Sequence, residues 1–267
     1  VLLAASGGLL FLPLFFSLMN GQDTAILLLG ASLWVFGLLS GKDVISGLGL
    51  SLLNVRPHIA LILALPMLFY RRKVFLGFLL GSFLLALFSV VLVGIDGTYE
   101  YLNILFISAG GKWYGIQQNA MFNLMGLLLR LLPGLNAQTI RVLAWVVYGI
   151  AIVYLCILWA RSKNLQAGLI GLSVTLALFA VPHLHFHDLT LLLIPIYELI
   201  RVSKETGNLK TSIAITIPIA ISLLLLISNI SYYLQYTTPY LIMLILIVYP
   251  FYQRFEMPVR ASQLVNK

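Results

Sequence analysis

The sequence predicts an all-α, polytopic integral membrane protein with about nine to ten transmembrane or half-membrane helices. Composition is the first observation behind this fold class: 61% of the 267 residues are hydrophobic and only 9% are charged, against about 25% charged residues in ordinary soluble domains. The second observation is distribution, because apolar runs recur along the whole chain and the mean hydropathy is +1.04. Too few charges exist to cover a water-facing surface, so most segments must be surrounded by lipid or by other apolar helices.

Seven apolar runs are long enough, or nearly long enough, to cross a hydrocarbon layer of about 30 Å. They are Leu2–Met19, Thr24–Ser40, Val74–Ile95, Ile140–Ala160, Gln166–Val181, Thr211–Ile230 and Pro239–Tyr252. Val44–Tyr70 is too long for one straight span and contains Pro57, which predicts two short limbs around a break. Thr190–Ile200 is short with Pro195 inside it, and Ala120–Leu132 is expected to be a half-inserted or surface helix. Broken helices at membrane depth need protein or a wet cavity beside their backbone, which indicates a site.

Most of the 16 lysines and arginines lie in four groups between the apolar runs. The groups are Arg71–Lys73, Arg161 with Lys163, Arg201 with Lys204 and Lys210, and Arg254 with Arg260 and Lys267. If all four groups are cytoplasmic, segments 95–119, 182–188 and 231–238 are external, as the positive-inside rule requires. Two limbs in Val44–Tyr70 then place Asn20–Asp23 and Arg56 outside, whereas a single span would place Asn20–Asp23 inside. Membrane orientation explains the net charge of +8, so nucleic acid is not expected as a partner.

The chain begins with Val1, and Val1–Met19 lacks the basic flank and the small-residue cleavage site of a signal peptide. We therefore expect a fragment: a single multi-spanning membrane domain over residues 1–267 that lacks the N-terminal spans and the first external loop. The single cysteine, Cys156, has no partner within the chain, so disulfides contribute nothing.

Polar residues beside apolar runs need a physical reason, because an ionisable group at the bilayer centre costs about 2.5–3.5 kcal/mol. Asn20, Gln22 and Asp23 precede an apolar run, where they either cap a helix or border an anion site at its first N–H groups. Arg56 lies between two apolar limbs, next to Pro57. Its guanidinium either binds a phosphate through two parallel hydrogen bonds or reaches the lipid headgroups.

The loop 110–119 combines glycines, a cation, two aromatic residues and three amides. The polar and aromatic members are Lys112, Trp113, Tyr114, Gln117, Gln118 and Asn119. Aromatic faces can cover the apolar side of a sugar ring while amides bond its hydroxyls, which favours a sugar ligand. An aromatic belt at the membrane interface is the alternative for Trp113 and Tyr114. Arg130 further along either contacts a lipid phosphate or marks the return of the chain to the headgroup level.

The densest ionisable cluster consists of His183, His185, His187 and Asp188. An extended strand would turn the three imidazoles one way for zinc, whereas a helix would align only His183 with His187. Hydrogen bonding to a substrate, a base assisted by histidine, or an interfacial loop without a role are the alternatives. No second metal signature occurs, so no metal site is expected. Phosphate-cradling GxxxxGK[ST], GxGxxG after a strand, GxSxG and HExxH are all absent from the sequence, which disfavours ATP-driven transport and serine hydrolysis.

Several short motifs occur in a recognisable order. They are Asn20–Gln22 before an apolar helix, the glycine-rich limb Gly47–Leu53 ending in Arg56–Pro57, the basic turn Arg71–Lys73, the run Gln117–Ala120 followed by the helix of Arg130, and His187–Asp188 before a helix with Pro195. In this order and spacing, over about residues 20–195, the chain resembles the membrane glycosyltransferases of family 87 in the GT-C superfamily.

The resemblance implies a GT-C-like fold and transfer of a hexose, mannose above all, from a polyprenyl-phosphate donor to a lipid or glycan acceptor. It places the active site at the external face of the bacterial plasma membrane and requires no cofactor. The superfamily's catalytic aspartate lies ahead of the Asn-Gly-Gln motif, so the general base is expected upstream of Val1, with Asp188 as a weaker candidate inside the chain.

Two sets of binding residues follow from these features. The expected donor-phosphate ligands are Arg56, Lys112 and Arg130; the expected sugar or acceptor ligands are Asn20, Gln22, Gln117, Gln118, Asn119, His185 and His187. Two other functions stay open from the sequence: a transporter or flippase of lipid-linked sugars, and a non-enzymatic membrane subunit. A transporter favours matching broken segments in two halves, and the sequence has no second copy of the break at Asn54–His58.

Overall fold

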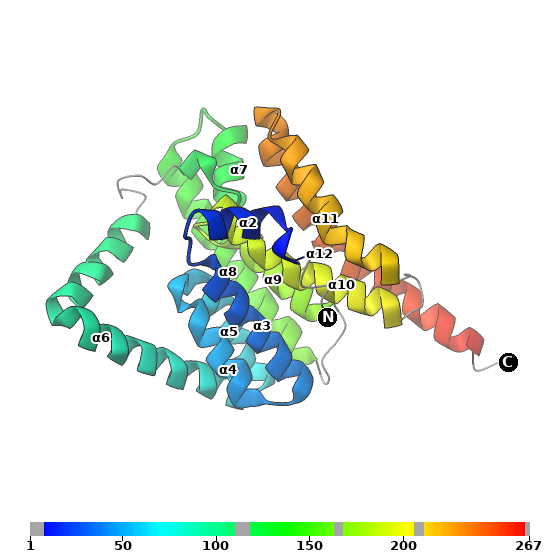
Figure 1. Ribbon diagram of the computed structural model, residues 1–267, viewed down its shortest axis with the longest axis horizontal. Coiled ribbons are helices and arrows are strands. Elements are labelled where there is room, and N and C mark those ends of the chain that lie inside the picture. Colours follow the sequence, from blue (N-terminus) through cyan, green and yellow to red (C-terminus); the bar gives the residue numbers. More distant parts are fainter. Residues whose placement is uncertain (1–7, 110–117, 163–167, 206–210, 265–267) are drawn as a thin grey trace.

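The computed structural model describes residues 8–109, 118–162, 168–205 and 211–264, and over these residues it is helical throughout, with no strand. Figure 1 shows a bundle from which α6 and α12 extend to opposite sides. The helices are α2 (Leu12–Met19), α3 (Thr24–Ser40), α4 (Asp43–Leu52), η1 (Leu53–Val55), α5 (Pro57–Tyr70), α6 (Arg72–Ala109), η2 (Gln118–Ala120), α7 (Leu124–Leu131), α8 (Ala137–Arg161), α9 (Leu169–Ala180), η3 (Phe186–Leu192), α10 (Leu193–Glu205), α11 (Thr211–Ser228) and α12 (Tyr232–Leu264). The predicted all-α class is confirmed.

Two described helices are long and apolar enough to cross a membrane, Arg72–Ser108 and Ala137–Arg161. Shorter apolar helices accompany them, including α3, whose bounds coincide with the predicted run. The predicted pair of limbs in Val44–Tyr70 is confirmed, because α4 and α5 are separated by the 3-10 turn η1. The eight-residue α7 agrees with the short helix expected within Ala120–Leu132.

Two expectations about the ends of helices are wrong, and a third is confirmed in part. The apolar span predicted to end at Ile95 does end there, because Gly94 has the non-helical angles φ 76° and ψ 176°, but a second helix and not a loop follows as far as Ala109. Residues 232–238 belong to α12 rather than to a loop. The break expected at Pro195 lies earlier, in η3, and Pro195 falls in the first turn of α10, where a missing N–H costs little. Helix satisfies backbone groups internally, so it persists where water is scarce.

Small residues bring α3, α4 and α6 into close contact. A Cβ atom added at Gly49 would lie 2.6 Å from the backbone nitrogen of Trp34 in α3, and one at Gly47 would lie 2.3 Å from the carbonyl oxygen of Val74 in α6. In the same helix, the Ser46 hydroxyl donates a hydrogen bond of 2.8 Å to the carbonyl of Trp34. Helices in lipid associate by such close packing and by interhelical hydrogen bonds. The glycine-rich limb therefore fixes the hairpin that ends at Arg56.

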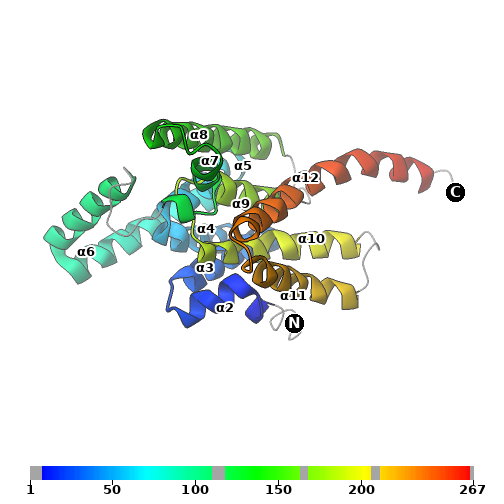
Figure 2. The same ribbon diagram turned by 90° about the horizontal axis from the view of Figure 1, so that it is seen from above.

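The buried core joins α5, α8 and α9 behind that hairpin. Trp159 of α8 is fully buried, lies 4.8 Å from the ring of Tyr70 in α5, and donates a hydrogen bond of 2.9 Å to Ser173 in α9. At the other end of α5, the hydroxyl of Tyr148 donates to the carbonyl of His58 at 2.7 Å. Viewed from above, α8 lies along one side of the bundle with α5 beside it, and α2 lies along the opposite side (Figure 2). The packing of these helices fixes the end of α5 that carries His58 and supports the neighbouring start of α3, which follows Asp23.

Candidate functional site

The break between α4 and α5 determines where Arg56 lies. Pro57 occupies the first position of α5, and its ring disfavours a helical conformation at the residue before it. Arg56 accordingly has φ −126° and ψ 80°, outside the helical region. The guanidinium therefore leaves the helix axis at the end of the hairpin, where the sequence predicted an ionisable group beside a bend.

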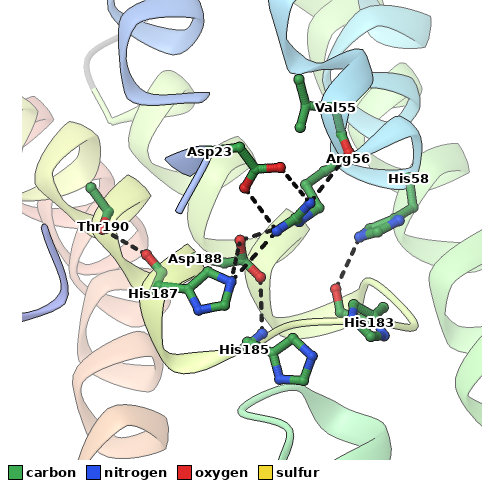
Figure 3. Close-up of polar contacts among 9 residues, drawn as sticks. All are labelled: Asp23, Val55, Arg56, His58, His183, His185, His187, Asp188 and Thr190. Carbon is green, nitrogen blue, oxygen red and sulfur yellow. Dashed lines mark hydrogen bonds and ion pairs between the residues drawn. The ribbon is translucent and has the colours of Figure 1, made fainter. Parts of the chain in front are cut away.

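Asp23 binds the outer edge of the Arg56 guanidinium. The two terminal nitrogens of Arg56 donate to the two carboxylate oxygens of Asp23 at 2.9 and 3.0 Å (Figure 3). Asp23 precedes α3, yet its side chain makes no cap bond to the helix. The helix-capping alternative is therefore wrong for Asp23, whose carboxylate makes a two-point ion pair with a residue 33 positions away.

Asp188 binds the inner side of the same guanidinium. Its Oδ1 lies 3.4 Å from Nε of Arg56, and its side chain is 0% exposed. Its Oδ2 accepts the backbone N–H of His185 at 2.9 Å, so that Asp188 also fixes the start of η3. One guanidinium thus lies between two carboxylates that come from α3 and η3 (Figure 3).

The predicted histidine cluster adjoins this ion pair. Nε2 of His187 lies 3.5 Å from a terminal nitrogen of Arg56 and 3.8 Å from Oδ1 of Asp188. The His183 and His185 rings are 4.5 Å apart and nearly perpendicular. His58, which the sequence analysis did not select, donates from Nε2 to the carbonyl of His183 at 2.9 Å. This bond ties the first turn of α5 to the histidine-rich loop.

The histidines in the loop between α9 and η3 are neutral at pH 7. Burial, together with the nearby His185 and His58, lowers the pKa of His183 to about 3, while Asp188 opposes the shift. Burial also lowers the pKa of His185, again against the effect of Asp188. Neutral imidazoles offer one donor and one acceptor each, which suits hydrogen bonding to hydroxyl groups. Within the described part of the chain no group of three His, Cys, Asp or Glu side chains is arranged to hold a metal, so the zinc alternative gains no support.

Arg130 occupies a second junction, between α7 and α12. It donates to the carbonyl of Met121 at 3.1 Å and to the hydroxyl of Tyr240 at 2.6 Å, and its guanidinium lies 4.0 Å from the centre of the Tyr236 ring. The Tyr240 hydroxyl in turn donates to the carbonyl of Asn123 at 2.7 Å. These contacts hold α7 against α12, and a role of Arg130 in binding phosphate stays a prediction.

The described amides that are predicted to bind sugar lie on two other segments, the turn before α3 and the 3-10 turn η2. Asn20 and Gln22 are exposed in the turn next to Asp23. Gln118 accepts a hydrogen bond of 3.3 Å from Arg141 of α8. A few residues further on, Phe122 donates its backbone N–H to the carbonyl of Leu184 at 3.0 Å, which brings this turn against the histidine-rich loop. Lys112 and Gln117 lie outside the described residues, as does the side chain of Asn119.

The sequence analysis therefore selected Arg56, Asp188 and the histidine cluster but assigned no binding role to Asp23 or His58. Asp23 has the position and residue type of an ordinary helix cap, and His58 follows a proline that explains the local bend by itself. The available signal was their ionisable character at the ends of apolar helices. Their partners are distant in sequence, and only the folded chain shows the pairing.

The long apolar helices in the described part of the chain indicate a membrane protein, and its ionisable side chains gather around Arg56 at the end of a broken hairpin. The chain matches the family model of glycosyltransferase family 87 over residues 1–182. It belongs to that family and is a glycosyltransferase, so the resemblance predicted from its motifs is confirmed. The chain matches none of the curated proteins and none of the solved structures with which it was compared. The matched segment includes Asp23 and Arg56 and ends just before His183.

Proposed function

We propose that this glycosyltransferase moves a hexose from a polyprenyl-phosphate donor to a lipid or glycan acceptor, and that this hexose is mannose. Arg56 carries this proposal, because it supplies a planar cation at the end of a broken helix in a chain with 9% charged residues. The proposal includes a bundle of about nine to ten transmembrane or half-membrane helices around the site. It requires no cofactor, because the donor phosphate is itself the leaving group.

The chemistry of the donor matches the groups that Arg56 offers. When the bond from the anomeric carbon to the phosphate oxygen breaks, the polyprenyl phosphate leaves with the electron pair and gains negative charge. A guanidinium that donates two parallel N–H bonds binds this charge more strongly than the charge of the intact donor. Arg56 thereby stabilises the transition state, and Lys112 and Arg130 are the further cations we assign to the donor phosphate.

The acceptor hydroxyl must lose a proton as it attacks, and a carboxylate is the usual base. Asp188 is a poor base here, since it is fully buried and engaged by Arg56 and by the N–H of His185. Its geometry supports a positioning role that keeps the guanidinium in place. A base ahead of the Asn-Gly-Gln turn, as the family resemblance implies, stays our expectation.

We assign sugar or acceptor contacts to the exposed turn before α3, to the amides of the 117–119 run and to the histidine-rich loop. The residues concerned are Asn20, Gln22, Gln117, Gln118, Asn119, His185 and His187. Amide and imidazole groups both form hydrogen bonds with hydroxyls, the groups that a hexose presents in greatest number.

The external location is supported by charge at the other end of the same helices. Arg71 ends α5 and donates to the carbonyl of Leu38 at 3.1 Å, near the end of α3. The 17 residues of α3 rise about 25 Å at 1.5 Å per residue, so Arg71–Lys73 and Arg56 lie at opposite ends. If the basic turn is cytoplasmic, as in most membrane proteins, the Arg56 site faces outward in a bacterial plasma membrane.

Sugar transfer from labelled polyprenyl-phosphate mannose, measured with purified protein in liposomes, tests the proposal. Arg56→Ala should lower kcat about 10²–10³-fold, the loss typical of removing one transition-state donor. Arg56→Lys should lie between, because lysine keeps the charge but not the two-point geometry. Arg71→Ala is the matched control, since Arg71 makes a comparable ion pair of 3.3 Å with Asp43 at the far end.

If Arg56→Ala transfers sugar at the wild-type rate, Arg56 is not part of the active site. Wild-type protein that moves lipid-linked sugar between leaflets without transferring it would instead indicate the flippase alternative.

A further inference from the structure

Asp23 occupies the edge of Arg56 that the donor phosphate needs. Its carboxylate oxygens take both terminal nitrogens at 2.9 and 3.0 Å, a two-oxygen anion bound in a fork. The two non-bridging oxygens of a phosphodiester can take the same two N–H groups in the same pattern. The structure therefore shows that this edge is open to a planar pair of oxygens, and that a protein carboxylate holds it.

The two acids around Arg56 differ in how firmly each is held. The Asp188 side chain is 0% exposed and has a second bond, from the N–H of His185, whereas the Asp23 side chain is 34% exposed. Among the described residues Arg56 is the only hydrogen-bonding partner of the Asp23 carboxylate. Separating Asp188 from Arg56 would leave a buried charge without its partner, which is strongly unfavourable. Asp23 can turn into solvent instead.

The balance of charge also favours displacement of Asp23 rather than Asp188. With both acids in place, one guanidinium faces two carboxylates, and this surplus negative charge repels an incoming phosphate. Once Asp23 turns away, Arg56 and Asp188 form a neutral pair whose outer edge is unoccupied. The phosphate then meets donors without a competing anion. Asp188 keeps the guanidinium aligned throughout, from its buried side.

We infer that the Asp23 carboxylate occupies the position of the donor phosphate in the unliganded protein. It accepts hydrogen bonds from the outer edge of Arg56 there, and it is displaced from that edge when a polyprenyl phosphate binds. This inference rests on the proposed function of the Arg56 site. It makes Asp23 a competing anion that occupies the outer edge of Arg56 between turnovers, while Asp188 holds the guanidinium in place. The ligand class is a lipid phosphate mono- or diester, with the phosphate adjacent to Arg56.

Neutral substitutions at Asp23 test the exchange directly. Binding of a short-chain polyprenyl phosphate to the purified full chain in detergent, measured by equilibrium dialysis, should tighten about fivefold in Asp23→Asn. That factor corresponds to about 1 kcal/mol, the upper value for a partly exposed ion pair. The KM for polyprenyl-phosphate mannose should fall by a similar factor with kcat unchanged. Asp23→Ser should behave alike, and serine is a favourable residue before a helix, so it guards against misfolding.

Two controls separate competition from general effects. Asp43→Asn removes the acid of the matched pair with Arg71 at the far end and should leave phosphate affinity unchanged. Asp23→Glu keeps the competing carboxylate and should bind phosphate as weakly as wild type. Inorganic phosphate should bind every variant more weakly than the lipid phosphate does, because it lacks the chain that anchors the ligand in the membrane domain; equal affinity would show that the site takes free phosphate and would overturn the assignment of a lipid phosphate.

Unchanged or weaker phosphate binding in both neutral variants would overturn the inference. A fall in kcat with unchanged KM would also overturn it, since Asp23 would then take part in the chemistry. These results differ from failure of the proposed function, in which wild-type protein transfers no sugar although it binds the lipid phosphate.

Discussion

The packing of α4 against α6 gives a stability prediction that can be worked from distances. In Gly47→Ala, the new Cβ would lie 2.3 Å from the carbonyl oxygen of Val74, 2.6 Å from the nitrogen of Phe78 and 2.7 Å from the carbonyl carbon of Gly77. All three atoms are backbone of α6, so no rotamer change can relieve the contact. Ordinary contact begins at 3.4 Å, and the two helices must therefore separate by roughly 1 Å.

Overpacking of this kind costs about 1–3 kcal/mol. For a chain of this size a loss of about 2 kcal/mol lowers the unfolding temperature by roughly 4–8 °C. Because α4 leads through η1 directly to Arg56, a shift of α4 should also lower sugar transfer. Circular dichroism melts in detergent, together with the transfer assay in liposomes, measure both effects on the same preparations.

Gly149→Ala is the matched control, because no atom lies within 4 Å of the Cβ that would be added there in α8. Alanine is favoured over glycine inside a helix by about 0.5–1 kcal/mol, so this variant should melt at or slightly above the wild-type temperature. If Gly47→Ala melts with wild type, the close approach of α4 and α6 does not determine stability and the reasoning fails.

Two further predictions concern the site. Asp188→Asn removes the buried charge that faces Arg56 and should lower stability to unfolding by about 1–3 kcal/mol, the cost of leaving a buried polar group without its partner; a wild-type melting temperature would contradict the buried ion pair. Because burial depresses the pKa of His183 from 6.5 to about 3, the unfolded chain binds more protons between these values, and stability should fall as the pH drops below about 6.5. His183→Gln should lose less melting temperature than wild type between pH 7 and 5, and an equal loss would assign the acid sensitivity elsewhere.

Much of the fold could be predicted because its causes are local. The run Thr24–Ser40 is apolar without interruption, and α3 has the same bounds. Pro57 acts on its immediate neighbours, so the break before α5 follows from the sequence. The end of α6 could not be predicted in this way. The apolar run ends at Ile95 and Gly94 does break the helix there, yet a second helix follows as far as Ala109, where the sequence had suggested a loop.

The candidate site, like the fold, could be predicted from the sequence only in part. Composition established that ionisable residues are scarce and therefore need partners, which drew attention to Arg56 and Asp188. It did not identify Asp23 as the partner of Arg56, because an aspartate before a helix is usually a cap. The contact joins residues 33 positions apart, and that of His58 with His183 joins residues 125 apart.

By itself, then, the sequence determined a helical membrane glycosyltransferase of family 87 with a cation at a proline break. Hydrophobicity, proline geometry and short motifs act over a few residues and can be read in order. Only the tertiary structure decided that two acids share one guanidinium, with one buried and one exposed. Burial and pairing arise from helices packing across the bundle, and no local pattern of residues specifies which distant side chains that packing brings together.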